Sequence, residues 1–409
     1  MRVLFVTHNV PRFNADAAGS FVLRLAVALQ AAGARVEILA PGAPGMPTRD
    51  VLDGVIIHRV RYAADARMTL AYTGTMVEQV RRSWHARLAL LGLLRALRRS
   101  ARAAVADAAR HGDAFSVVHT HWWFPAGLAL WRLWPRPTAT RHSPARVLTM
   151  HGSDVRLART LAPARALLRA VLGEYRVRTV VSTWLAATIR AMDTTLAVRV
   201  APMPVDTKQF TLPLTDARDG ILFVGRLNAQ KGLADLLRSL TYPALQSASL
   251  HVVGDGADRA SLEAQATAAG VSSRVRWHGT LSSTELVPLY QRAVVVAMPS
   301  REEGLGLVAV EAQLCGAPVV AYESGGLTDV VRADAGGVLV PVGDIAALAS
   351  AIASLVDQPA EAARRGRLAH AEMLARFSPE TVAQRYLECY RDAIAATDST
   401  RADTALSAP

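Results

Sequence analysis

Short apolar runs alternate with helical patterns along this chain, and that alternation constrains the fold more than any other feature of the sequence. Residues 2–7 are expected to form a buried strand, and Gly19 opens a helix whose apolar positions recur at helical spacing. Further strands are expected over residues 36–39, 55–60, 117–120, 147–150, 179–182 and 198–201, with a helix over 163–172. Strands that alternate with helices are typical of βαβ units, so the sequence predicts a parallel sheet.

A second series of the same kind follows residues 202–220, which contain three prolines and no sustained period. Its strands are expected over 221–224, 250–253, 275–278, 294–298 and 319–322. Because 409 residues exceed what one hydrophobic core usually serves, we expect two doubly wound α/β domains whose loop edges face each other across a cleft. The predicted order is a first domain over 1–201, a linker over 202–220, a second domain over 221–377, a helix over 378–396 and a disordered tail over 397–409.

Composition narrows the protein class and its compartment. Apolar residues make up 51% of the chain and charged residues 20%, which favours a globular protein. Two cysteines, Cys315 and Cys389, are too few for a disulfide framework and indicate a reducing compartment. The chain shows neither the apolar start of a signal peptide nor the roughly 20 apolar residues of a membrane-spanning helix. We therefore expect a cytoplasmic protein, either free or peripheral at the inner face of the cell membrane.

The net charge of +12 is unevenly distributed. Residues 1–200 carry 28 arginines and 11 acidic residues, a net charge of +17, whereas residues 201–409 have a net charge of −5. A basic first half indicates an anionic surface or partner, such as the inner membrane leaflet or a phosphorylated acceptor, and charge alone leaves nucleic acid open. Only Lys208 and Lys231 are lysines, which suggests that base composition favoured arginine codons. The positive charge is therefore weaker evidence for an anionic partner.

One segment stands outside the alternation. Residues 81–102 combine six leucines, Trp84 and seven arginines in the pattern of a basic amphipathic helix. Such a helix can lie in a membrane interface, with its leucines and Trp84 in the headgroup boundary. It can equally pack on the sheet of the first domain with a solvated arginine face. The sequence leaves both alternatives open.

Each predicted domain has glycines at a strand-to-helix turn, where bare backbone and helix amides can meet a phosphate. Neither turn has the dinucleotide or P-loop fingerprint, which argues against an oxidoreductase and an NTPase. In the second domain, Arg226 and Lys231 follow the strand over 221–224 and could converge on one diphosphate. Two ordinary surface cations beside a turn would give the same spacing.

The sharper pattern follows the strand over 294–298. Glu303 precedes a turn with two glycines, Gly304 and Gly306, and Glu311 lies about two turns inside the apolar helix that follows. Amides at that helix start would form an anion site. One carboxylate could accept a hydrogen bond from a sugar hydroxyl and the other from a ribose.

Four strings together resemble the nucleotide-sugar glycosyltransferases of the GT-B fold known as family 4 or group 1, whose members retain the anomeric configuration. The strings are Gly225-Arg226 with Lys231-Gly232, Gly254-Asp255-Gly256, Glu303 with Glu311, and His151-Gly152-Ser153-Asp154. The resemblance covers both domains. It is specific for the superfamily and poorly specific for the substrate.

The resemblance implies a role for each matching residue. Arg226 and Lys231 would bind the donor diphosphate and stabilise the leaving group in place of a metal ion. Glu303 would contact the donor sugar, and Glu311 the ribose. The implied backbone contacts are Gly306 and Leu307 to sugar or phosphate, Leu281 in the string His278-Gly279-Thr280-Leu281 to the base, and Gly19 of the first domain to the diphosphate.

Three histidines of the first domain are candidates of different kinds. His151 follows the strand over 147–150, and the resemblance gives it a catalytic support role at the donor sugar. His119 and His121 share one strand face but lack further ligands at a recognisable spacing, so we predict no metal site. With the neighbouring tryptophans they would either line the acceptor side of the cleft or simply pack.

Departures from the family pattern lie at Ala18-Gly19, at Met203-Pro204-Val205-Asp206 and at Leu305, which replaces a frequent phenylalanine. They weaken the expectations for the Gly19 region, the hinge and the floor under the sugar. The predicted activity is hexose transfer from a UDP-sugar, or else GDP-mannose, to a hydroxyl acceptor, without metal, cofactor or nucleic-acid partner. A lipid-linked or polysaccharide precursor is the first acceptor and a soluble metabolite the second. A nucleotide-sugar epimerase or an inactive donor-binding protein would share the architecture.

Overall fold

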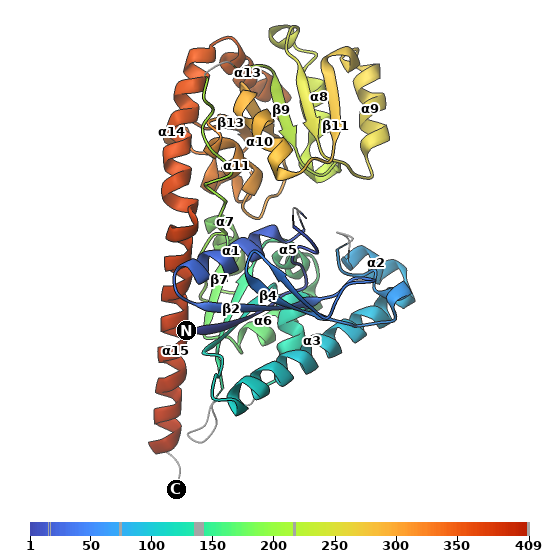
Figure 1. The fold of residues 1–409 in the computed structure, drawn as a ribbon. Coiled ribbons are helices and arrows are strands. Elements are labelled where there is room, and N and C mark those ends of the chain that lie inside the picture. The colour runs from blue at the N-terminus through green and yellow to red at the C-terminus, as the bar shows by residue number, and fades with distance from the viewer. Residues whose placement is uncertain (15, 17, 73–75, 135–142, 216–217, 407–409) are drawn as a thin grey trace. The chain divides into compact units, whose positions relative to one another are not determined.

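The computed structural model describes residues 1–409 apart from 15, 17, 73–75, 135–142, 216–217 and 407–409. The chain divides into two compact units (Figure 1). The first comprises residues 1–181, 186–204 and 382–409, and the second comprises residues 182–185 and 205–381. This division differs from the predicted boundaries, because residues 205–220 group with the second unit and most of the last helix groups with the first.

The first unit is built on an eight-stranded sheet in the order β3-β4-β2-β1-β5-β6-β7-β8. All neighbouring strands are parallel except β3, which is antiparallel to β4. The strands are β1 Arg2–Val6, β2 Arg35–Pro41, β3 Arg49–Leu52, β4 Val55–Val60, β5 Val117–His121, β6 Ala145–Met150, β7 Val177–Val180 and β8 Arg199–Val200. Its helices are α1 Ser20–Ala31, α2 Met76–Arg82, α3 Trp84–Arg110, α4 Leu128–Leu130, α5 Ser153–Thr160, α6 Ala162–Leu172 and α7 Thr183–Met192, the last of which starts within the second unit's residues.

The second unit has a six-stranded, wholly parallel sheet in the order β11-β10-β9-β12-β13-β14. Its strands are β9 Ile221–Val224, β10 Leu250–Val253, β11 Val275–Gly279, β12 Val295–Met298, β13 Val319–Tyr322 and β14 Val338–Val340. Its helices are α8 Leu233–Ser239, α9 Arg259–Ala268, α10 Ser283–Arg292, α11 Leu307–Leu314, α12 Leu327–Val330, α13 Ile345–Val356 and α14 Pro359–Phe377. Both sheets confirm the predicted doubly wound α/β architecture, and β3 and β14 are strands that the sequence analysis did not predict.

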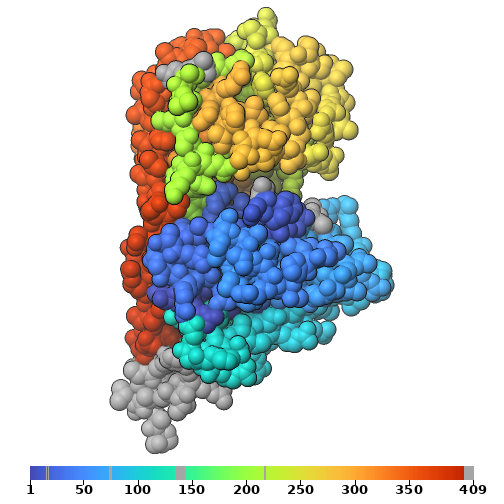
Figure 2. Space-filling view, in the orientation of Figure 1, coloured from blue at the N-terminus to red at the C-terminus, as the bar shows by residue number. Residues whose placement is uncertain are grey.

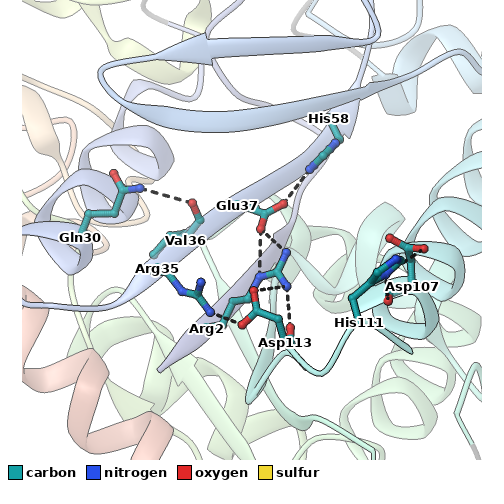
Figure 3. Close-up of polar contacts among 9 residues, drawn as sticks. All are labelled: Arg2, Gln30, Arg35, Val36, Glu37, His58, Asp107, His111 and Asp113. Carbon is teal, nitrogen blue, oxygen red and sulfur yellow. Dashed lines mark hydrogen bonds and ion pairs between the residues drawn. The ribbon is translucent and has the colours of Figure 1, made fainter. Parts of the chain in front are cut away.

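Ion pairs join the first strands of the first unit (Figure 3). The Arg2 guanidinium donates to Glu37 Oε1 at 2.5 and 3.0 Å and to Asp113 Oδ2 at 3.0 Å. His58 Nε2 lies 2.8 Å from Glu37 Oε2, and these bonds to His58 and Arg2 lower the pKa of Glu37 to about 2. The network therefore links β1, β2 and β4 away from the turns that follow their carboxyl ends.

The predicted helix over 81–102 is two helices, since α2 ends at Arg82 and α3 begins at Trp84. Ser83 interrupts them because its extended backbone and its side chain, which accepts from the amide of Ala86, form an N-cap. One face of α3 packs in the core of the first unit through Leu93 and Leu97. The sheet-packing alternative is therefore correct for that face.

The last helix, α15, spans Pro379–Leu406. The predicted end at residue 396 and the predicted disorder from 397 are therefore wrong up to Leu406, and residues 407–409 lie outside the described residues. Tyr386 and Tyr390 of α15 are buried in the first unit, where the Tyr386 hydroxyl donates to the carbonyl of Ala201 at 2.9 Å. These tyrosines explain why the helix groups with the first unit.

Candidate active site

The predicted motifs of the second unit follow the carboxyl ends of four neighbouring strands, β11, β10, β9 and β12. Backbone hydrogen bonds connect three of these turns: the amide of Gly225 donates to Val253 O at 3.0 Å, and that of Gly254 donates to Gly279 O at 2.8 Å. A Cβ on Gly254 would lie 1.9 Å from the carbonyl oxygen of Gly225, so only glycine permits this contact. The Gly254-Asp255-Gly256 string thus packs the turns together at the edge where open α/β sheets bind ligands.

Lys231 is placed by the turn after β9. The Asn228 side chain accepts from the amide of Lys231 at 3.2 Å and caps the short 3₁₀ turn Ala229–Lys231. Gly232 follows with a φ of 72°, and a Cβ there would lie 2.0 Å from the carbonyl oxygen of Pro299. The turn after β9 is therefore held against the segment after β12, which carries Glu303.

Lys231 and Glu303 form a direct ion pair, with 2.5 Å between Nζ and Oε1. Their side chains keep 22% and 12% of their surface exposed, so the pair is shielded but remains reachable from solvent. The methylenes of Lys231 lie 3.6 Å from the position that a Cβ would take on Gly225. The structure thus brings Lys231, Glu303 and the β9 turn together, while Arg226 of the same turn is exposed.

Helix α11 begins at Leu307, four residues beyond Glu303. Its N-cap, Gly306, has a φ of 93°, no side chain caps the helix, and its first turn holds no acidic residue. Leu307 is its first residue, so the orphan amides and the positive end of the helix dipole lie close in sequence to Glu303. This arrangement suits an anionic ligand.

Glu311 and Leu281 belong to the segments that follow β12 and β11. Glu311 Oε2 accepts a long hydrogen bond of 3.4 Å from the hydroxyl of Tyr290 on α10. Leu281 stands between β11 and the capping box of α10, in which Ser282 and Glu285 bond reciprocally. The roles of Glu311 and Leu281 toward a donor stay predictions.

In the first unit, Asp154 shapes the turn that carries His151. Its Oδ1 accepts from the amides of His151, Gly152 and Val155 at 3.1 Å, and its Oδ2 accepts from the amide of Trp123 at 3.1 Å. Burial raises the pKa of this carboxyl group to about 6 against the opposing effect of the four amides. Asp154 is therefore a positioning residue that links the segments after β5 and β6.

His151 belongs to a group of four histidines, in which His119 and His121 are fully buried and His8 and His151 are partly exposed. His151 Nε2 lies 3.1 Å from His121 Nδ1, and the ring centroid of His151 lies 4.2 Å from that of Trp122. Burial lowers the pKa of His8 to about 4 and of His121 to about 3, and it lowers the pKa of His151 and His119 well below the ordinary value. All four rings are consequently neutral at neutral pH.

The turn after β1 contributes residues that the sequence analysis did not single out. His8 Nδ1 and Asn9 Oδ1 are buried and have no hydrogen-bond partner within the described part of the chain. Gly19 lies against them, because a Cβ there would be 2.6 Å from the carbonyl carbon and oxygen of Asn9. The polar triplet Thr7-His8-Asn9, directly after a buried strand, was the available signal.

His119 does not line a binding surface. It is fully buried, and its ring nitrogens lie 2.8 Å from the Tyr390 hydroxyl and 2.7 Å from Thr149 Oγ1. Trp122 and Trp123 are buried as well, so the packing alternative describes this segment and the acceptor-lining alternative is wrong for it. Among the described residues, no group of three or more histidine, cysteine or acidic side chains is arranged to hold a metal ion.

Two Rossmann-like units with glycine-rich turns have the architecture of the GT-B glycosyltransferases. Comparisons with known proteins agree with this architecture. The family model described as "Glycosyltransferase Family 4" matches residues 18–209, and the one described as "Glycosyl transferases group 1" matches residues 205–371. The chain belongs to this glycosyltransferase family. It is 34% identical over 325 residues to D-inositol 3-phosphate glycosyltransferase of Acidothermus cellulolyticus, a match that covers 71% of this chain and 70% of that one.

Solved structures are similar in fold. Sucrose-phosphate synthase from Thermosynechococcus elongatus superposes with a TM-score of 0.78 at 24% identity, covering 97% of this chain and 100% of that one. Anabaena HepE, solved in complex with UDP and glucose, gives a TM-score of 0.64 at 17% identity, covering 95% and 98%. In the described part of this chain, no helix is long and apolar enough to cross a membrane.

Proposed function

We propose that this glycosyltransferase moves a hexose from a UDP-sugar to a hydroxyl acceptor with retention at the anomeric carbon and without a metal ion. The observation that carries the proposal is the Lys231–Glu303 pair, which lies beside the β9 turn and precedes the uncapped start of α11. A cation, a carboxylate and free helix amides are the groups that a diphosphate sugar needs.

The ion pair suggests how the donor engages the site. A diphosphate carries more negative charge than Glu303 and competes for Lys231, with Arg226 as the second cation. Once Lys231 turns to the diphosphate, the Glu303 carboxylate is released to accept a hydrogen bond from a sugar hydroxyl. Both cations then stabilise charge on the leaving group, the task that a metal ion performs in other transferases.

The remaining predicted contacts follow from the family. Glu311 would hold the ribose, Leu281 the base through its backbone, and Gly306 and Leu307 the sugar or phosphate through their amides. His151 would support the reaction as a neutral imidazole, a form that its depressed pKa favours. Gly19 would approach the diphosphate. UDP is our first donor nucleotide, supported by the UDP bound to HepE, and GDP-mannose is the second.

Two acceptor classes have separate support. The basic first 200 residues and the exposed side of α3 favour a lipid-linked or polysaccharide precursor at the cytoplasmic membrane face. The name of the inositol-phosphate relative favours a soluble phosphorylated acceptor instead. A nucleotide-sugar epimerase of the same architecture would convert the donor with no acceptor present.

The test is release of nucleoside diphosphate from UDP-, GDP- and ADP-sugars in the presence of a chelator. Parallel reactions contain a membrane extract, inositol phosphate, or no acceptor, and the anomeric configuration of the product is read by NMR. We expect UDP release that needs an acceptor and a product of retained configuration. Turnover only after metal addition, an inverted product, or donor conversion without acceptor would each refute one part of the proposal.

A further inference from the structure

An arginine-lined groove of about 370 Å³ lies in the first unit, on α3 and the segment that follows β4. Figure 2 shows that the α3 segment, in cyan to teal, forms part of the surface of this unit. Five of the eight lining residues are arginines, and none is acidic. The arginines are Arg61, Arg95, Arg98, Arg99 and Arg102. We call this feature the arginine groove.

The walls of the arginine groove are fixed by packing. A Cβ on Gly92 would lie 2.2 Å from the carbonyl oxygen of Tyr62, so glycine lets α3 pass directly against the residue next to Arg61. Arg98 donates to the carbonyl oxygens of Trp131 at 2.7 Å and of Arg132 at 3.0 Å. Arg98 therefore serves as a fixed wall, and the space between α3 and Arg61 is set by backbone contact.

The charge of the groove is largely uncompensated. Arg61 pairs with Asp65, but Arg95, Arg99 and Arg102 are exposed and have no acidic partner within the residues that the structure describes. The first acidic residue of α3 is Asp107, beyond the groove. Guanidinium groups gathered in this way repel one another until an anion lies between them, and their forked donors fit phosphate oxygens.

Exposed apolar side chains continue the line of these arginines along α3. Trp84, Leu88 and Leu91 are 61%, 53% and 47% exposed, and their spacing of four and three residues places them on one face of the helix. Arg95, Arg99 and Arg102 continue the same face. A soluble phosphate ester would contact the arginines but not the exposed apolar side chains, whereas a membrane interface contacts both.

We propose that the arginine groove binds the phosphate headgroup of an anionic phospholipid, with Trp84, Leu88 and Leu91 entering the headgroup boundary beside it. The exposed face of α3 is then a membrane-docking surface with a headgroup site built into it. This inference deepens the membrane-linked acceptor of the proposed function and rests on it only for its use in the cell, because binding to lipid is measured without any transfer.

The test is co-sedimentation of the full chain with vesicles of phosphatidylcholine, alone or mixed with phosphatidylglycerol. We expect binding only to the mixed vesicles, and a loss of about 100-fold in the triple variant Arg95→Gln, Arg99→Gln, Arg102→Gln, since each arginine near an anionic surface contributes roughly fivefold. The matched control removes the same charge at exposed positions off α3, by Arg238→Gln, Arg276→Gln and Arg391→Gln, and keeps binding within about fivefold.

Two further measurements distinguish a phospholipid headgroup from free phosphate as the ligand of the arginine groove. Trp84→Ala should weaken vesicle binding while leaving the arginines intact, and excess inorganic phosphate should compete poorly. Equal losses in both triple variants, or tight binding of inorganic phosphate with no binding to mixed vesicles, would overturn the inference. Vesicle binding by a chain that transfers no sugar would leave the groove in place and refute the proposed function.

Discussion

The candidate site of the second unit holds a charged pair, whereas the histidines at the equivalent edge of the first unit are neutral and largely buried. Lys231 and Glu303 form a shielded ion pair that solvent still reaches. His121 and His151 share a hydrogen bond, and burial depresses the pKa of both rings. On the proposed function, the second unit would bind the charged diphosphate, and the first unit would present the neutral ring of His151.

Two sheets of the same architecture thus carry different chemistry at their carboxyl edges. In the second unit, glycines bring backbone and a cation together at the turns. In the first unit, aromatic rings surround the histidines and remove water, which disfavours the charged imidazolium.

Removing the cation of the second unit should have the largest effect. We expect Lys231→Ala to lower kcat/KM for nucleoside diphosphate release about 10³-fold, because the leaving diphosphate loses a charge-stabilising donor. Lys208→Ala is the matched control, since Lys208 is the only other lysine, is exposed, and lies in the same unit. Activity of the Lys231 variant within tenfold of that control would remove Lys231 from the site.

Removing the carboxylate of Asp154 should destabilise the first unit. Asp154→Ala leaves four amides without their acceptor, so we expect a loss of about 3 kcal/mol in the free energy of unfolding. Denaturant titration measures the change, with Asp334→Ala, at an exposed carboxylate, as the control. A loss below about 1 kcal/mol would show that the turn holds His151 without Asp154.

Removing the imidazole of His151 should affect the reaction more than donor binding. We expect His151→Ala to lower kcat about 10²-fold with little change in the KM for the donor, as for a group that acts mainly in the transition state. Steady-state kinetics with varied donor separate the two constants. An increase in KM with an unchanged kcat would assign His151 to binding instead.

The buried histidines should make stability depend on pH. Their pKa is lower in the folded than in the unfolded chain, so the unfolded state binds more protons below about pH 6.5, and stability falls as the pH drops from there toward 4. Asp154 opposes this trend, because its raised pKa stabilises the fold as the pH drops through 6.

We expect His121→Gln to reduce the stability difference between pH 7.5 and 5.5 by about 1 kcal/mol. His111→Gln, at an exposed histidine, serves as the control and should leave that difference unchanged. Denaturant titrations at the two pH values measure the effect. An identical pH dependence in both variants would contradict a neutral His121.

The sequence predicted the sheets and the second unit's motifs because strand runs and glycine turns are local signals. It placed Lys231 and Glu303 near a common edge, but their ion pair joins residues 72 positions apart and required the fold. The break at Ser83 was missed because the apolar spacing continues across it. The last turns of α15 were missed because Thr397 opens a polar segment, although the structure buries Thr397 and its hydroxyl donates to the carbonyl of Ala393 at 2.7 Å.

The histidine group was the least predictable part. His8 comes from the turn after β1, His121 from β5 and His151 from the turn after β6, so only the sheet order brings them together. Their depressed pKa values depend on burial by Trp122 and Phe21, which no spacing rule reveals. Asp154 was recognised as part of a motif, whereas its four amide contacts emerged only from the structure.

Calorimetric binding of UDP to the wild-type chain and to the double variant Arg226→Ala, Lys231→Ala, with chelator present, tests the diphosphate site most directly. We predict binding to the wild type and at least about a 100-fold weaker affinity in the double variant, because two charge-assisted contacts to the diphosphate are removed. Equal affinity in both proteins, with both folded by circular dichroism, would show that the diphosphate does not bind at the Lys231–Glu303 site.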